Sequence, residues 1–161
     1  MTKFTTKNDL PEATRAQVIE MLNLRLADAI ALQSQAKQAH WNVKGAQFIA
    51  LHRLFDEVSD AVLEYTDIIA ERAVQLGGVA EGTAKMAVQR AQLAPYPLDI
   101  SSGREHCEAL SAALAIFGQT VRANIALAEA ANDKDTADLC TQISRGTDRW
   151  LWLVEAHLHA D

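Results

Sequence analysis

Five residues with metal-binding side chains are concentrated in one short part of this chain. His40 and His52 supply imidazole nitrogens, and Asp56, Asp67 and Glu71 supply carboxylates. Imidazole together with carboxylate is a ligand mixture that iron accepts. Metal chemistry, with iron as the metal, is therefore the leading hypothesis.

The spacing of these residues decides which of them can bind one ion. On a helix whose residues advance by about 100° and about 1.5 Å each, four of them share one face. These four are His52, Asp56, Asp67 and Glu71. Asp56 and Asp67 nevertheless stand about 16 Å apart along the helix axis, whereas metal–ligand bonds are only about 2 Å long. The two pairs cannot bind the same ion within one subunit.

Two copies of this helix, crossing antiparallel near Ala61 and Val62, would bring the pairs together. The first pair of one subunit would then meet Asp67 and Glu71 of the other, and the two-fold axis would create the site twice. His40 ends the preceding helix, so a short reversal of the chain places it beside this helix. The residues thus predict an interfacial metal site and a homo-oligomer, at minimum a dimer.

Other interpretations of the same residues stay open. Acids and histidines on a helix face are commonly solvated, and pairs at four-residue spacing arise by chance. A helical oligomer with structural zinc or no metal is therefore a further possibility. A di-iron site inside a single bundle would need Glu-x-x-His pairs, and the sequence has no such pair.

The elements that position these residues are expected to be helices. Strand signals are almost absent, and apolar residues recur at helical spacing over about 11–42, 47–77, 103–131 and 136–157. A short helix near 84–90 is expected within a long crossover between the second and third long helices. This pattern predicts an all-α, ferritin-like four-helix bundle at residues 11–161, behind a short N-terminal tail at residues 1–10. The inward side of the third long helix is expected to comprise Leu110, Leu114, Phe117, Val121, Ile125 and Leu127.

Bulk properties limit the function classes. The chain has 161 residues and a formal net charge of −6, which argues against a surface built mainly for phosphate backbones. No uncharged apolar run approaches the about 20 residues that span a bilayer, so a cytoplasmic protein without a membrane anchor is expected. Cys107 and Cys140 lie far apart and form no CxxC pair, so they receive no functional role.

Two segments resemble the signatures of the Dps family of DNA-protecting mini-ferritins. They are His40–His52 and Asp67–Gly78, and Tyr96–Ile100 and Trp150–Trp152 also resemble the later part of that family's chain. The resemblance covers essentially everything after about Asn8. It implies a hollow dodecamer of four-helix bundles, with ferroxidase centres at the two-fold subunit contacts.

Carried across residue by residue, the resemblance assigns the catalytic iron ligands to two subunits. His40, His52 and Asp56 would come from one subunit, and Asp67 and Glu71 from its neighbour. The implied enzyme oxidises Fe(II), preferably with hydrogen peroxide, stores Fe(III) inside the shell and so protects DNA from oxidative damage.

Two further roles follow from the resemblance with weaker support from the residues. Trp41 matches the family tryptophan beside the centre, which is regarded as a sacrificial radical trap, although a core aromatic residue fits the sequence equally well. Asp133, Asp135 and Asp138 are candidates for an iron-entry pore at a three-fold axis. Acids at the start of a helix, however, also cap it and interact favourably with its dipole.

Direct DNA binding is the alternative function. Many Dps proteins bind DNA through a lysine-rich N-terminal extension, which neutralises phosphates without reading bases. This chain has only Lys3 and Lys7 before its first helix, with Asp9 and Glu12 close behind. A nucleoid-compacting protein with secondary metal chemistry would need avidity from many weak tails.

Overall fold

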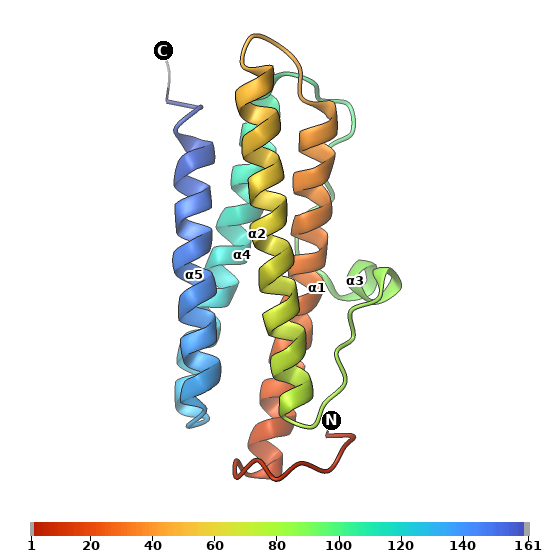
Figure 1. Ribbon diagram of the computed structural model, residues 1–161, viewed down its shortest axis with the longest axis vertical. Coiled ribbons are helices and arrows are strands. Elements are labelled where there is room, and N and C mark those ends of the chain that lie inside the picture. The colour runs from red at the N-terminus through yellow and green to blue at the C-terminus, as the bar shows by residue number, and fades with distance from the viewer. Residues whose placement is uncertain (1, 160–161) are drawn as a thin grey trace.

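The computed structural model describes residues 2–159 as a bundle of four long helices with one short helix beside it (Figure 1). The helices are α1 (Glu12–Asn42), α2 (Phe48–Gln75), α3 (Ala84–Arg90), α4 (Gly103–Ala130) and α5 (Lys134–Glu155). Within these residues the backbone forms no strand, only an isolated bridge between Lys44 and Ser102. The expected all-α fold, with a short helix in the crossover between the second and third long helices, is confirmed.

Local sequence explains where the helices begin and turn. The α1–α2 connection reverses at Gly45, whose φ of 110° is accessible to glycine at little steric cost. At the start of α4 a capping box joins Ser102 and Glu105, so both of their backbone N–H groups are satisfied. The reversal at Gly45 holds the end of α1, which carries His40, against the start of α2, which carries His52.

The core lies between the α1–α2 and α4–α5 hairpins. Its largest fully buried side chains include Phe55, Phe117, Leu22, Leu26, Leu110 and Leu114. α4 is long and apolar enough to cross a membrane by length and composition alone, but 44% of its most apolar window is buried inside the bundle. The apolar side chains on the inner face of α4 thus pack in the core of the bundle.

One expected core position in α4 is wrong. Leu127 is 49% exposed, whereas the neighbouring buried positions are Val121, Asn124 and Ala128. These three positions follow the helical repeat, and Leu127 points away from their face. Apolar character alone suggested burial for Leu127, but the register of the buried stripe excludes it.

The N-terminal segment folds back onto the far end of α2 (Figure 1). The backbone N–H groups of Lys3 and Phe4 donate to the carbonyl of Gly77 at 2.8 and 3.0 Å. Arg15 adds a hydrogen bond to the carbonyl of Leu76 at 3.1 Å. The described part of the tail is therefore attached to the bundle.

Candidate metal centre

Two histidines face each other across the α1–α2 hairpin. The rings of His40, near the end of α1, and His52, early in α2, stack with centroids 3.7 Å apart and an interplanar angle of 21°. Nδ1 of His40 lies 2.7 Å from the carbonyl oxygen of His52, and Nδ1 of His52 lies 2.8 Å from the carbonyl oxygen of His40. A carbonyl only accepts, so each Nδ1 carries the hydrogen and each Nε2 keeps a lone pair. Both imidazoles are thus fixed in the tautomer that binds a metal through Nε2.

The carboxylate of Asp56 lies near these imidazoles, one helical turn after His52 on α2. Oδ1 of Asp56 lies 3.8 Å from Nδ1 of His40. Lys37 of α1 donates a hydrogen bond to the same oxygen. This bond is the main reason that the pKa of Asp56 lies below its ordinary value, and the nearby His40 and His52 act in the same direction. Asp56 is consequently available as a charged oxygen ligand at neutral pH.

Lys37 is a residue of this site that sequence reasoning missed. It stands one turn before His40 on α1, so the two residues share a helix face. That spacing was the available signal, but a single lysine at three-residue spacing is common on any helix. Its contact with Asp56 depends on how α1 and α2 pack together.

Aromatic side chains border the centre. The ring of Phe48 lies 5.1 Å from that of His52, tilted by 33°. Trp41, next to His40 in the chain, is 67% exposed, which excludes the core interpretation of this tryptophan within one subunit. Within one subunit, one aromatic ring, that of Phe48, therefore borders the imidazole of His52.

Asp67 and Glu71 do not join the centre within one subunit. Both are exposed and lie in the second half of α2, about 16 Å or more along the helix from Asp56. Across residues 2–159, no three His, Cys, Asp or Glu side chains are grouped closely enough to hold a metal ion. One subunit alone therefore presents two partial sets of potential ligands, and neither the set with His40, His52 and Asp56 nor the set with Asp67 and Glu71 forms a complete site by itself.

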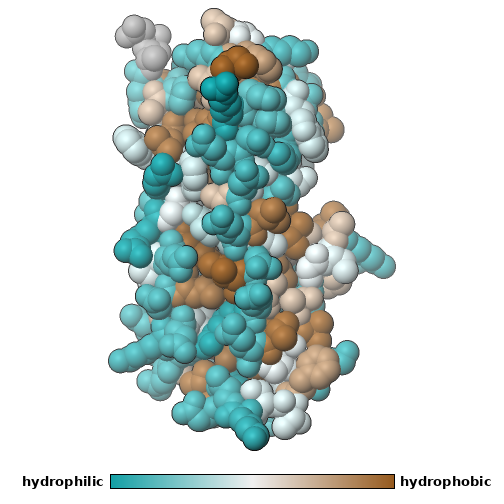
Figure 2. Space-filling view, in the orientation of Figure 1, coloured by the Kyte–Doolittle hydropathy of each residue, from teal (hydrophilic) through white to brown (hydrophobic). Residues whose placement is uncertain are grey.

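The surface between these two groups contains apolar side chains. Leu63 of α2 is 56% exposed and lies in a shallow depression with Ile30 of α1, Asp67 and Ala70. In Figure 2, apolar side chains reach the surface among polar ones in the middle of the face formed by α1 and α2. The predicted ligands therefore flank a partly apolar helix face.

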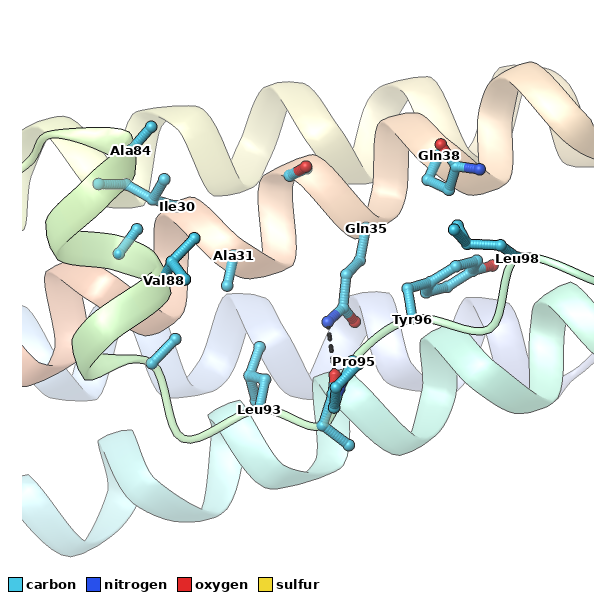
Figure 3. Close-up of a pocket in the computed structure, with 14 residues that line it drawn as sticks. Ile30, Ala31, Gln35, Gln38, Ala84, Val88, Leu93, Pro95, Tyr96 and Leu98 are labelled. Atoms are coloured by element: carbon cyan, nitrogen blue, oxygen red, sulfur yellow. Dashed lines mark hydrogen bonds between the residues drawn. The ribbon is translucent and has the colours of Figure 1, made fainter.

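A second apolar surface adjoins α1 on its other side. A groove of about 510 Å³ runs between α1, α3 and the segment at residues 91–98, with Ile30, Leu93 and Tyr96 among its walls (Figure 3). Val88 and Leu98 line it as well, although they are 85% and 79% exposed. Two exposed aliphatic side chains beside an apolar groove are characteristic of an interaction surface.

One of the three pore candidates is excluded. Asp133 is 2% exposed and accepts hydrogen bonds from Arg72 at 2.7 Å and from the backbone N–H of Thr136 at 3.0 Å. It caps α5 and pairs with a buried arginine, so it cannot line an aqueous channel. Asp135 and Asp138 are exposed and remain candidates. Because Arg72 follows Glu71, the same network fixes the end of α2 that carries Glu71.

Comparisons with known proteins agree on one family. Residues 19–161 match the Ferritin family, described as a ferritin-like domain. The DNA protection during starvation protein of Agrobacterium fabrum is 42% identical over 158 residues, which cover 98% of each chain. Among solved structures, DpsA14 from Streptomyces coelicolor has a TM-score of 0.94 at 31% identity, covering 99% of this chain and 95% of that one. Dps from Mycobacterium smegmatis has a TM-score of 0.92 at 26% identity, covering 97% and 95%. This chain belongs to the Dps family of ferritin-like proteins.

Proposed function

We propose that this protein is a ferroxidase and iron store whose reaction centres are shared between two-fold-related subunits. His40, His52 and Asp56 of one subunit and Asp67 and Glu71 of the next would bind Fe(II) as the substrate. The observation that carries this proposal is the reciprocal bonding of His40 and His52, which leaves a lone pair on each Nε2, with the charged carboxylate of Asp56 close to His40.

The donor set suits the proposed reaction. Two nitrogen and three oxygen donors bind Fe(II) and leave positions for hydrogen peroxide, and the carboxylates stabilise the Fe(III) product through their charge. When two Fe(II) ions each give one electron to one hydrogen peroxide and two protons are taken up from water, two Fe(III) ions and two water molecules form, and free hydroxyl radical is avoided. Removal of both peroxide and Fe(II) would protect DNA without contact with it.

Exposed apolar side chains on one subunit support its proposed pairing with a second copy. Exposed Leu63 lies between the two ligand groups, and the groove beside α3 carries exposed Val88 and Leu98. A second copy that crosses α2 antiparallel would cover Leu63 and place each ligand group opposite the complementary one. These surfaces support contacts between copies, and from the family membership we propose a closed, dodecameric shell in the cytoplasm as the assembled form.

Direct DNA binding is less well supported than protection by iron chemistry. The protein has a net charge of −6, and the backbone of Lys3 is bonded to Gly77 instead of extending into solvent. Few fixed positive charges are thus available to neutralise phosphates. The family name of the relatives is consistent with protection through either route.

A mixed-subunit assay tests the shared centre. One variant carries His52→Ala with Asp56→Ala, and the other carries Asp67→Ala with Glu71→Ala. Each homo-oligomer should lose rapid Fe(II) oxidation by peroxide. After joint dissociation and reassembly, activity should return to about one quarter of wild type, because half of the dimers are mixed and each restores one of its two centres.

The outcomes of this assay are distinct. A centre within one chain would gain nothing from mixing, because both chains would carry a defective half. Rapid oxidation by either unmixed variant would contradict the proposed ligands themselves. Unmixed wild-type protein taken through the same reassembly provides the reference rate.

A further inference from the structure

A partly buried phenol–imidazole pair lies outside the proposed centre. The hydroxyl of Tyr96, in the crossover before α4, lies 2.8 Å from Nδ1 of His106 in α4. The rings are stacked, with centroids 6.0 Å apart and an interplanar angle of 14°. His106 is 1% exposed, whereas Tyr96 is half-buried and forms part of the wall of the groove beside α3. The ferroxidase chemistry described above does not use either residue.

Burial determines where the proton of this pair rests. It raises the pKa of Tyr96 and lowers the pKa of His106, so the phenol stays protonated and the imidazole stays neutral at neutral pH. With the ring hydrogen of His106 on Nε2, the phenol donates its hydrogen bond to Nδ1. The backbone of Asn42 favours the protonated form of this ring, and it would support an imidazolium formed there.

We propose that Tyr96 and His106 form a proton-coupled one-electron donor that intercepts strong oxidants inside the protein. Tyr96 gives one electron to the oxidant while its phenolic proton crosses the 2.8 Å hydrogen bond to Nδ1 of His106. The O–H bond breaks and an N–H bond forms, which leaves a neutral tyrosyl radical and an imidazolium. The oxidant is of the hydroxyl radical class, and it is reduced to hydroxide.

The position of the pair suits this role. His106 interacts with the backbone of Asn42, two residues after the proposed ligand His40. The backbone of Lys44 bonds to the carbonyl of Ser101 at 2.9 Å, which fastens the crossover to the same end of α1. Single-electron reduction of peroxide by one Fe(II) would generate hydroxyl radical close by. That source of oxidant rests on the proposed function, whereas the redox property of the pair does not.

The chain provides a matched control for the experiment. It has two tyrosines, and the other is Tyr65 of α2. The hydroxyl of Tyr65 packs against Gly146 and bonds with the indole of Trp150, which is not a base. Both tyrosines have a raised pKa through burial, so they differ mainly in whether a proton acceptor is present.

Metal-free, assembled protein is oxidised with a photogenerated ruthenium(III) tris-bipyridine complex and frozen for electron paramagnetic resonance. Ring-deuterated tyrosine separates tyrosyl from tryptophanyl signals. Wild type and Tyr65→Phe should give the same tyrosyl radical, and Tyr96→Phe should lose it. His106→Gln should give a lower yield and a shorter lifetime. A signal that is lost in Tyr65→Phe, or that His106→Gln leaves unchanged, overturns the proposal.

A second measurement uses only the wild-type protein, so its result does not depend on whether the variants fold. In deuterium oxide, the radical should show a hyperfine coupling to one exchangeable deuteron hydrogen-bonded to the phenoxyl oxygen, because His106 retains it. Absence of this coupling also overturns the proposal. No iron is present in either measurement, so a negative result here leaves the mixed-subunit assay as a separate test of the ferroxidase.

Discussion

His40 and His52 each donate a ring hydrogen bond to the backbone carbonyl of the other, and their rings stack 3.7 Å apart. Replacing either one removes a ligand and also a support of the other ligand. We therefore expect His40→Ala and His52→Ala to be non-additive in Zn²⁺ affinity, with a coupling of about 0.5–3 kcal/mol. Calorimetric titration of the two single variants and the double variant measures this coupling.

The control for this cycle is His157, near the end of α5, whose ring bonds to the carbonyl of Leu153 in its own turn. His157→Ala combined with His40→Ala should give additive effects within about 0.5 kcal/mol. Additivity of His40 and His52 themselves would contradict the mutual support that the hydrogen bonds indicate.

Lys37 competes with an incoming metal for Asp56. Its ammonium group bonds to the carboxylate and is the main cause of the lowered pKa of Asp56. Lys37→Gln removes that positive charge, so we expect Zn²⁺ to bind about ten-fold more tightly near neutral pH. Lys44→Gln removes an equally charged but exposed lysine nearby and should have little effect. Weaker binding by Lys37→Gln would show that Lys37 orients Asp56 for the metal instead of opposing it.

The two cysteines should be chemically inert in the folded protein. Burial raises the pKa of both Cys107 and Cys140 to about 11. At about pH 8 only about one thiol in a thousand is then ionised, and the thiolate is the reactive form. Ellman's reagent should label both thiols rapidly in denaturant and very slowly without it. Rapid labelling of the native protein would contradict their place in the core.

His106 should make stability depend on pH in one definite direction. Its folded pKa is lowered, mainly by burial, from the ordinary value of 6.5, so the unfolded chain binds the proton more tightly. The contribution of the neutral His106 ring to the free energy of unfolding is complete above about pH 6.5. It is lost as the pH falls below that value toward the folded pKa. The free energy of unfolding should thus fall more steeply on acidification for wild type than for His106→Gln. Parallel pH profiles of the two proteins would rule this out.

The sequence allowed the parts that depend on local order to be predicted. Helical periodicity and the Gly45 reversal were sufficient to place His40 beside His52. The pairs Lys37–Asp56 and Tyr96–His106 could not be predicted, because each joins different elements and depends on packing between them. Tyr96 lies in an irregular crossover where no periodicity indicates which way a side chain points.

The same distinction explains the errors about Asp133 and Leu127. An acid near a helix start could equally be a solvated pore residue or a cap, and only the approach of Arg72 from α2 decides that Asp133 is buried. For Leu127, residue type suggested burial, and the register of α4 opposed it. The spacing along α2 predicts that Asp67 and Glu71 complete the centre of a second subunit, and the mixed-subunit assay tests that prediction.

Gly77 controls how firmly the N-terminal tail is held. Its φ is 85°, and an added Cβ would lie 2.7 Å from the carbonyl oxygen of Phe4. Gly77→Ala therefore strains the turn and displaces the tail, at a cost of about 1 kcal/mol in the free energy of unfolding. Limited proteolysis should then cleave near Lys3 and Lys7 faster than in wild type. Gly82→Ala is the matched control, because the nearest atom to its added Cβ is 3.6 Å away.

The same variant separates protection by iron chemistry from protection by DNA binding. If the attached tail withholds Lys3 and Lys7, Gly77→Ala should retard DNA at low salt more than wild type does, and added salt should abolish the difference. Fe(II) oxidation should change little, because the bond between Arg72 and Asp133 fixes the end of α2 that carries Glu71, ahead of the Gly77 turn. Tight, salt-sensitive retardation by wild type itself would instead favour the DNA-binding alternative, since it would require cationic groups beyond these two lysines.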